Sequence, residues 1–302
     1  MRHLTIYRFI DAIAKAGSIR KAAESLSITP SALNRRILTI EDEMGIAIFE
    51  RLPRGVRLST AGELMIHNIR NHLADMERVQ SQIADLSGVR RGHVSVASSQ
   101  ALLPYFLPEQ IETYRSSHPG VTFSVFVRDR EAAEQSLMEY SADIALVFEP
   151  VRLSEVHTML TIRQPIMAVM EKDHPLAKQK EVRLSDTLSY PLALPSTPYG
   201  VRTLLEAAAK KKSLQMRAVV QSDSFEFLMN FALTNKAISF QIEIGLPPEK
   251  RDSHLVYRPV SSRDVPAGIL HLGYLRGRAL PIAASRFADQ LASAFVEKFD
   301  CV

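Results

Sequence analysis

The chain has 302 residues, of which 46% are hydrophobic and 23% charged, and a formal net charge of +4, values typical of a globular protein with more than one domain. No apolar run approaches the roughly 20 residues of a membrane span, and Asp11 and Lys15 interrupt the apolar N-terminus, which argues against a signal peptide. The single cysteine, Cys301, excludes an intrachain disulfide and a multi-thiolate metal site, so we expect a cytoplasmic protein without a membrane partner.

The first 41 residues contain three helical patterns. Apolar residues from Leu4 to Ile13 recur at helical spacing and predict an amphipathic helix that ends near Gly17. Two shorter patterns follow within residues 18–41 and meet at Ser27-Ile28. This arrangement is typical of a helix-turn-helix, which places its second helix in the DNA major groove. An ordinary solvated helical hairpin explains the stretch alone equally well.

The second helix of this pair has a strong start signal and a polar face. Thr29 is a good N-cap, and Pro30 suits the first helical position because proline lacks the N–H that would be unpaired there. The stripe predicted to be buried consists of Ala32 (or Leu33), Ile37 and Ile40. Asparagine and arginine on the exposed side suit contacts to base edges and phosphates. The residues predicted to contact DNA here are Ser18, Arg20, Thr29, Pro30, Ser31, Asn34, Arg35 and Arg36.

A short hairpin, or wing, is predicted after the third helix. Pro53 to Gly55 is a turn signal between short apolar pieces, and three arginines beside it, Arg51, Arg54 and Arg57, suit phosphate contacts. Residues 1–62 hold ten lysines and arginines against six acidic residues, whereas the remaining 240 residues hold 27 of each. The positive excess therefore lies in the segment with the helix-turn-helix pattern, as expected for a polyanion partner, although chance clustering gives the same count.

A helix of nearly thirty residues is predicted to begin at a capping box formed by Thr60-Ala61-Gly62-Glu63. Apolar residues and one glutamine recur within it at alternating spacings of three and four, a heptad stripe over about three repeats. We interpret the stripe as a dimerisation surface, because little else nearby is expected to bury it. The alternative is a helix packed on its own domain. The predicted dimerisation residues are Ile66, Ile69, Leu73, Met76, Gln80 and Ile83.

Beyond a predicted linker at residues 88–92, the pattern changes to alternating strands and helices. Strands separated by crossover helices predict an α/β region with largely parallel sheets covered on both faces. The predicted strands are 94–97, 121–127, 143–147, 166–170, 192–194, 218–221, 238–241 and 269–275. The predicted helices are 102–114, 131–140, 201–211, 225–233 and 282–299.

Taken in order, these features resemble the LysR-type transcriptional regulators over essentially the whole chain. The resemblance depends on a spaced set of residues and not on one motif. In the N-terminal region the set is Ala16-Gly17-Ser18, Ala22-Ala23-Glu24-Ser25-Leu26, Pro30 to Ile37 with Arg35, Glu41, Gly45, Phe49-Glu50-Arg51, Gly55-Val56-Arg57-Leu58-Ser59 and Ala61-Gly62. Later matches are His118-Pro119-Gly120-Val121, Ala142-Asp143-Ile144-Ala145 and His174-Pro175-Leu176-Ala177.

The resemblance implies three parts: a winged helix-turn-helix DNA-binding domain at 1–62, a linker or dimerisation helix with a hinge at 63–91, and an effector-binding domain at 92–302 that is similar to periplasmic binding proteins. Its two subdomains are expected at 92–162 with 266–302, and at 163–265. The resemblance also implies a homodimer or homotetramer that binds double-stranded promoter DNA and responds to a small-molecule effector. RNA polymerase is a further candidate partner.

Two positions depart from the family pattern. Pro30-Ser31 stands where the family usually has Gln-Pro, so the operator bases read at that helix end are expected to differ. Asn235-Lys236-Ala237-Ile238 stands where the family has a Gly-x-Gly-Ile turn. Asparagine tolerates a left-handed backbone, so we expect the turn to survive.

Candidate effector residues follow strands, because ligands of open α/β sheets bind at the carboxyl ends of strands near helix N-termini. Small hydroxyl residues gather at 98–100, 196–197 and 222–224 and would favour a carboxylate or phosphate, although such residues are also routine N-caps. The third group is closer to plain capping, Phe148 also fits a core role, and Arg202 fits a solvated one. The candidate effector-binding residues are Ser98, Ser99, Gln100, Phe148, Ser196, Thr197, Arg202 and Gln241.

Other classes of function fit less well. The nine histidines show no HExxH pair or other ligand spacing, so we predict no metal and no other cofactor. A small-molecule hydrolase or transferase would need a nucleophile elbow, a phosphate loop or a nucleotide-binding glycine motif, which are not found. A transport binding protein would need a signal peptide and has no use for residues 1–62. We therefore expect a DNA-binding regulator, and not an enzyme, that responds to a small anionic effector.

Overall fold

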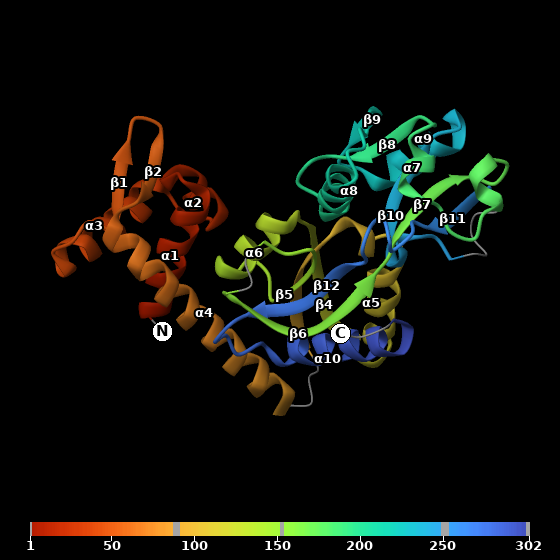
Figure 1. Ribbon diagram of the computed structural model, residues 1–302. Coiled ribbons are helices and arrows are strands. Elements are labelled where there is room, and N and C mark those ends of the chain that lie inside the picture. The colour runs from red at the N-terminus through yellow and green to blue at the C-terminus, as the bar shows by residue number, and fades with distance from the viewer. Residues whose placement is uncertain (1, 87–90, 152–153, 249–253, 300–302) are drawn as a thin grey trace. The chain divides into compact units, whose positions relative to one another are not determined.

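The computed structural model describes residues 2–86, 91–151, 154–248 and 254–299. The chain divides into two units, residues 1–83 and 84–302, and each has its own hydrophobic core (Figure 1). The first unit is helical with one small hairpin, and the second is α/β. None of the helices among the described residues is long and apolar enough to cross a membrane.

The first unit is a winged helix-turn-helix. Its elements are α1 (Arg2–Ala16), α2 (Ile19–Ser25), α3 (Pro30–Met44), β1 (Phe49–Leu52), β2 (Gly55–Leu58) and α4 (Thr60–Leu86). The apolar faces of the helices enclose one core, whose largest fully buried side chains are Ile10, Ile13, Leu33, Ile37 and Ile48. The predicted order of three helices, wing and long helix is present, and of the two residues Ala32 and Leu33 it is Leu33 that is buried.

The helices of this unit begin and end at the residues with the strongest capping chemistry. Ser18 Oγ accepts the N–H of Lys21 at 3.4 Å, and Thr29 Oγ1 accepts the N–H of Ala32 at 3.3 Å. Gly45 ends α3 with a left-handed φ of +64°, which a residue without Cβ adopts freely. Because both N-caps and the C-cap are satisfied, the ends of α2 and α3 are well defined.

The cap of α4 differs from the predicted capping box. Ser59 Oγ, and not Thr60, accepts the N–H of Gly62, at 3.0 Å. The same hydroxyl donates to the carbonyl of Ala47 at 2.6 Å. Ser59 therefore starts α4 and also ties it to the segment that leads into the wing.

The second unit contains two five-stranded sheets with helices packed against them (Figure 1). The first sheet has the order β4-β3-β5-β12-β6, with β3 (Arg91–Ser98), β4 (Gly120–Val127), β5 (Ile144–Phe148), β6 (Val156–Gln164) and β12 (Gly268–Leu275). The second has the order β11-β7-β10-β8-β9, with β7 (Ile166–Glu171), β8 (Leu192–Pro195), β9 (Ala218–Ser222), β10 (Ile238–Ile242) and β11 (Leu255–Pro259). The helices are η1 (Gln100–Leu102), α5 (Phe106–Ser117), α6 (Arg130–Met138), η2 (Pro175–Lys178), α7 (Leu184–Thr187), α8 (Gly200–Lys211), α9 (Phe225–Asn235), η3 (Glu243–Gly245) and α10 (Ile282–Lys298).

Both sheets are mixed, so the expectation of largely parallel sheets is wrong. Strand β3 pairs in parallel with β4 and β5, but β12 pairs antiparallel with β5 and β6. In the second sheet β8 pairs in parallel with β9 and β10, whereas β7 pairs antiparallel with β10 and β11. The antiparallel strands are the ones beside the two connections between the sheets, β6 to β7 through Pro165 and β11 to β12 through residues 260–267.

Several elements differ from the predicted ones. The strands β6 and β11 were not indicated by the sequence pattern. Arg91 and Gly92, expected in the linker, begin β3, while residues 88–90 of that linker lie outside the described residues. The helix expected at 102–114 is divided into η1 and α5, because Pro104 lacks the N–H that a continuous helix needs there.

The turn after α9 forms without glycine, as expected, but with a different left-handed residue. Lys236 has a φ of +48°, whereas Asn235 is the last residue of α9. Asn235 Nδ2 donates to the carbonyl of Phe231 at 3.1 Å and so satisfies an acceptor at the helix end. The asparagine therefore contributes through its side chain and not through its backbone conformation.

One of the two connections between the sheets is held by a buried carboxylate. Asp264 accepts two hydrogen bonds from Arg183, at 2.8 and 2.9 Å, and one from the N–H of Leu184 at 2.9 Å. Lys212 at the end of α8 also donates to it. Mainly because of the hydrogen bonds from Arg183, the pKa of Asp264 lies well below its ordinary value. The carboxylate fixes residues 260–267 to α7 and α8.

Candidate DNA-binding surface and effector cleft

Helix α3 has a polar face that is exposed and an apolar face that fixes the helix in the core of the first unit. Leu33, Ile37 and Ile40 are buried in the core of the first unit. The N-terminal end and the opposite face leave Pro30, Ser31, Arg35, Arg36 and Thr39 exposed, and Asn34 half-buried at the edge of the core. This part of α3 thus holds five of the eleven predicted DNA-contacting residues, including the Pro30-Ser31 pair that departs from the family pattern.

A carboxylate joins the end of α3 to the wing. Glu41 Oε1 accepts the backbone N–H groups of Ile48 and Phe49, at 2.7 and 2.9 Å. These are the last residue before β1 and its first residue. Glu41, noted only as part of the family resemblance, is therefore a structural residue that sets the distance between α3 and the wing.

The wing is an antiparallel hairpin whose tip lies against the turn before α2. The N–H of Val56 donates to the carbonyl of Gly17 at 3.0 Å. Gly55 has a φ of +110°, and a Cβ built there would lie 2.4 Å from the same carbonyl oxygen. Only glycine allows this close approach, which places the wing beside the helix-turn-helix.

The predicted DNA-contacting cations fall into two groups. Arg35 and Arg54 are exposed, and their side chains form no ion pair or hydrogen bond with any described residue. The others have partners in the same unit. Arg20 lies 3.7 Å from Glu24, Arg57 donates to Glu50 at 2.7 Å, Arg51 donates to Asn34 at 2.9 Å, and Arg36 stacks over Phe9 at 5.5 Å from the ring centroid. The charges of the first group are free to contact DNA, whereas those of the second group are preorganised or partly neutralised.

The predicted dimerisation stripe on α4 is partly used by its own unit. Ile66 and Ile69 are buried in the core with α1 and α3, and Leu73 packs against the same core. The expectation that little nearby could bury the stripe is therefore wrong for its first half, because the helix-turn-helix itself covers it. Further along α4, Met76 is half-buried, whereas Gln80 and Ile83 are exposed.

In the second unit, residues from both sheets meet in a narrow cleft at the carboxyl ends of the parallel strands. Four of the predicted effector residues line it: Ser99, Gln100, Phe148 and Gln241. The remaining lining residues, which sequence reasoning missed, are Ala101, Arg128, Asp129, Arg130, Tyr199, Gly200, Val201, Phe225 and Ile242. The enclosed volume is about 20 Å³, room for a single water molecule. The cleft is therefore too narrow for a small molecule at this point, and it adjoins a hollow of about 510 Å³ that shares Gln100, Phe225 and Gln241 with it.

Gln100 bridges the two sheets across this cleft. Its Oε1 accepts the N–H of Phe225, the first residue of α9, at 2.5 Å, and its Nε2 donates to the carbonyl of Asp223 at 2.9 Å. The first N–H groups of a helix have no intrahelical acceptor and lie at the positive end of the helix dipole. The amide oxygen of Gln100 thus occupies a position suited to an anion.

Phe148 closes the floor of the cleft by packing against two glycines. A Cβ built on Gly268 would lie 2.2 Å from Cζ of Phe148, and one built on Gly200 would lie 2.8 Å from its Cδ1. Gly268 begins β12 after the connection from β11, and Gly200 begins α8. The ring is 4% exposed, so Phe148 has the core role that the sequence offered as an alternative. It also lines the cleft.

Two further side chains give the cleft its polarity. Arg130, the first residue of α6, donates to the carbonyl of Glu149 and, at 3.2 Å, to Thr203 Oγ1 on α8. Burial, together with the negative charges of Asp223 and Asp129, raises the pKa of Tyr199 and keeps its phenol protonated. The sequence does indicate Arg130, because this residue stands at the start of a helix shortly after a strand. The effector-binding residues were instead predicted from clusters of hydroxyl side chains.

Gln241 supplies an unused donor to the cleft. The side chain is 1% exposed, and its Oε1 accepts the N–H of Ile242 at 2.9 Å. Among the described residues its Nε2 has no hydrogen-bond partner. This amide nitrogen lies near the end of β10, in the lining of the cleft.

The other predicted effector residues lie outside the cleft. Ser98 is fully buried and donates to the carbonyl of Ser99 at 3.0 Å, so strand packing accounts for it. Ser196 and Thr197 follow β8, but Thr197 lines an adjoining hollow that shares Asp129 and Arg130 with the cleft. Arg202 donates to Glu206 at 2.6 Å along α8, so its charge is used within the helix. These residues were chosen by sequence position, which does not show which side of each strand end faces the cleft.

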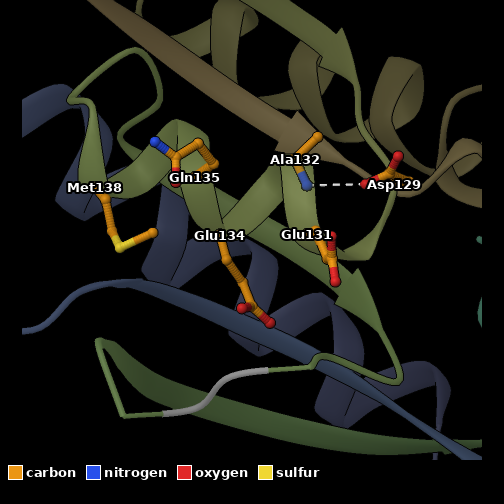
Figure 2. Close-up of a pocket in the computed structure, with 6 residues that line it drawn as sticks. All are labelled: Asp129, Glu131, Ala132, Glu134, Gln135 and Met138. Carbon is orange, nitrogen blue, oxygen red and sulfur yellow. Dashed lines mark hydrogen bonds between the residues drawn. The ribbon is translucent and has the colours of Figure 1, made fainter.

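A larger hollow of about 390 Å³ lies beside α6. Figure 2 shows its lining: three carboxylates, from Asp129, Glu131 and Glu134, with Gln135 and Met138 further along the helix. Asp129 caps α6 by accepting the N–H of Ala132 at 2.8 Å, and Glu134 accepts that of Val151 at 2.8 Å. The acidic lining repels an anion, so this hollow is unsuited to the expected effector. No group of three or more His, Cys, Asp and Glu among the described residues could hold a metal ion.

Two family models together match most of the chain. Residues 4–63 match the model described as a bacterial regulatory helix-turn-helix protein of the lysR family, and residues 87–296 match the LysR substrate binding domain. The chain belongs to the LysR family. The resemblance seen in the sequence is thereby confirmed, and with it a DNA-binding regulator that forms oligomers, binds promoter DNA and small-molecule effectors, and is not an enzyme.

Curated relatives and solved structures agree with this assignment. The chain is 24% identical over 96% of both chains to the transcriptional activator CmpR of Synechocystis, and 26% identical to a RuBisCO operon regulator of Allochromatium vinosum, covering 83% of this chain and 88% of that one. A full-length cysteine variant of OxyR from Pseudomonas aeruginosa has a similar fold, with a TM-score of 0.73 and 20% identity over 95% of this LysR-type chain and 94% of that chain. CbnR bound to its target DNA gives a TM-score of 0.61 at 16% identity, over 96% and 99%.

Proposed function

We propose that this LysR-type regulator reads its operator with α3 in the major groove and the wing on the adjacent backbone. The observation that carries the proposal is the exposed N-terminal end of α3, where Arg35 is free of partners, beside a wing whose Arg54 is equally free. The structure of CbnR with its target DNA, which has the same fold, supports this placement. In this arrangement Arg35 contacts a base and Arg54 a phosphate.

Binding measurements with the full chain and its own operator, recovered by sequencing genomic fragments that the protein retains, test this placement. Replacing Arg35→Ala should weaken operator binding by roughly 1–3 kcal/mol while leaving binding to unrelated DNA almost unchanged. Replacing Arg54→Ala should instead weaken binding to all sequences and flatten the salt dependence. An unchanged operator affinity of the Arg35 variant would remove Arg35 from the recognition surface.

We further propose that the cleft between the two sheets binds a small anion, carboxylate or phosphate, once it opens. The anion would replace the amide oxygen of Gln100 at the N–H of Phe225, with Arg130 as a counter-charge and Gln241 and Ser99 as neutral partners. QuiR, whose effector-binding domain has been solved with shikimate, supports a small molecule for this fold. Opening would change the populations of two arrangements of the regulator.

A ligand screen by thermal unfolding tests the anionic effector. A panel of small carboxylates and phosphates should contain compounds that raise the melting temperature of the wild-type chain, because a ligand that binds only the folded state stabilises it. The rise should be lost in Arg130→Gln and kept in the control Arg115→Gln, an exposed arginine of α5. A neutral or cationic ligand with the same residue dependence would show that the effector class is wrong.

The remaining features of the regulator are also proposals. The exposed second half of the α4 stripe, with Gln80 and Ile83, would pair two chains into a dimer, and two dimers could form a tetramer. The protein would act in the cytoplasm, need no metal or other cofactor besides its effector, and contact RNA polymerase at the promoter.

A further inference from the structure

The side chains of Asn34 and Arg51 join the recognition helix to the wing. Arg51 Nη2 donates to Asn34 Oδ1 at 2.9 Å. The chemistry of the pair fixes the orientation of the amide, because a guanidinium has only donors and the atom that faces it must be the amide oxygen. The amide nitrogen of Asn34, with its two N–H donors, is left for another partner.

Both ends of this hydrogen bond are held by the fold. Asn34 follows the fully buried Leu33 on α3. Arg51 lies in β1 opposite Val56, whose N–H is bonded to Gly17. Alternate residues of a strand point to one face, so Arg51 shares the face of the buried Phe49 and is directed toward the helices. The bond is therefore a consequence of how the wing is placed and not a chance surface contact.

The other wing arginines have different surroundings. Arg57 pairs with Glu50, which lies opposite it on the other face of the hairpin. Arg54 stands in the turn between β1 and β2 and contacts no residue of α3 among the described hydrogen bonds and ion pairs. Among these three arginines, Arg51 alone bonds to the recognition helix, and Arg54 serves as its matched control.

The hydrogen bond restricts which base Asn34 can read. A free asparagine recognises adenine with two bonds, because its amide oxygen accepts from N6 while its nitrogen donates to N7. Arg51 occupies one lone pair of this oxygen and holds it toward the wing. The groups left in excess are therefore donors, both on Asn34 and on the unused guanidinium nitrogens. Guanine is the base that presents two acceptors, O6 and N7, in the major groove.

We propose that Asn34 and Arg51 form a donor-rich pair that selects guanine over adenine at one position of each operator half-site. The inference rests on the placement of α3 in the major groove proposed above. Arg51 acts here as a positioning residue, which sets the direction of the asparagine amide, and as a second donor to the same base.

Selection from a randomised duplex library, followed by sequencing, tests the pair in the full-length protein. The wild type should enrich guanine at a position where Asn34→Ala shows no preference. Arg51→Met frees the amide oxygen, so the ratio of guanine to adenine at that position should fall by about tenfold. Arg54→Met should lower the affinity for all sequences alike and leave the base profile unchanged. Thermal unfolding of each variant checks its folding, which should be intact because Arg51 is exposed and Asn34 half-buried.

Three results would overturn the proposal. The first is an Arg51→Met profile identical to that of the wild type, with only a uniform loss of affinity, which would make Arg51 a phosphate contact. The second is a wild-type preference for adenine or thymine at the position that depends on Asn34. The third is a wild-type selection without any enriched sequence, which would remove α3 from the major groove and this inference with it, whereas the first two leave that placement intact.

Discussion

Gln100 and Phe225, 125 positions apart in the sequence, are joined by a hydrogen bond of 2.5 Å between the side-chain oxygen of one and the backbone N–H of the other. Gln100 follows β3 of the first sheet and Phe225 follows β9 of the second. The bond holds the cleft between the sheets closed from within, with a second bond to Asp223 on the same side chain. Any effector that uses the start of α9 must first displace this glutamine.

The first prediction concerns the exchange of the Phe225 amide hydrogen. In Gln100→Ala the amide has no acceptor, since the first N–H of a helix lacks an intrahelical one. Its hydrogen exchange should become about fivefold faster, because one hydrogen bond contributes about 1 kcal/mol. Hydrogen–deuterium exchange of the peptide covering 223–230 measures this. The control Gln135→Ala, which removes a bond within α6, should leave that peptide unchanged. Equal exchange in both variants would show that the bond does not persist in solution.

A second prediction concerns the coupling of Phe148 and Gly268. The Cβ of Gly268→Ala would lie 2.2 Å from the ring of Phe148, so this single variant should be destabilised by overpacking, typically by 1–3 kcal/mol (an order-of-magnitude estimate). Phe148→Leu alone should also destabilise the unit, because it empties part of a buried site.

The double variant should be more stable than the sum of the two losses predicts, by roughly 0.5–3 kcal/mol, because the smaller side chain leaves space for the new methyl group. A double-mutant cycle from urea unfolding gives this coupling energy. Strictly additive losses would mean that the ring moves aside freely and does not depend on Gly268.

A third prediction separates a close approach from simple backbone strain. Gly45 and Gly55 both have positive φ, but a Cβ on Gly45 meets nothing within 4 Å, whereas one on Gly55 lies 2.4 Å from the carbonyl oxygen of Gly17. Gly45→Ala should cost about 1 kcal/mol of folding free energy through its left-handed backbone. Gly55→Ala should cost clearly more and should also weaken binding to all DNA, because the wing shifts. Thermal unfolding and DNA binding of both variants measure the difference, and equal losses would contradict the contact.

The fourth prediction is a pH dependence at Asp264. Arg183 is the main cause of its lowered pKa, so the folded state holds this carboxylate ionised where the unfolded chain would protonate it. The stabilisation should be fully present above the ordinary pKa of 3.8 and decline as the pH falls below it. At neutral pH, Asp264→Asn should lower the melting temperature of the second unit by roughly 5–10 °C.

Melting curves of wild type and Asp264→Asn over a range of pH check the sign. The difference between them should shrink as the solution is acidified below pH 3.8. A difference that stays constant or grows on acidification would mean that the charge of Asp264 does not contribute, and that the variant fails for reasons of packing.

The first unit could be predicted from sequence because its signals are local. Thr29, Pro30 and Gly45 each specify a helix end through their own chemistry, and the turn at Gly55 specifies the wing. The second unit was harder for the opposite reason. Strand β6 pairs with β12, more than a hundred positions later, and its half-buried alternating residues gave no distinct signal.

The cleft could be predicted only in part. The rule that ligands bind at the carboxyl ends of parallel strands led to Ser99 and Gln100, which line this cleft. It could not show that Ser98 is buried and that Thr197 lines an adjoining hollow, because one residue of register decides the face. It also could not show that Arg130 at the start of α6 and Tyr199 before α8 line the same cleft.

The burial of Ile66 and Ile69 has a mechanical consequence. Because these two side chains share a core with α3, the beginning of α4 and α3 are expected to move together as one rigid unit. A rotation of the far end of α4 would then rotate α3 by the same angle. In a dimer that binds as proposed, the distance between the two copies of α3 along the DNA would change with it.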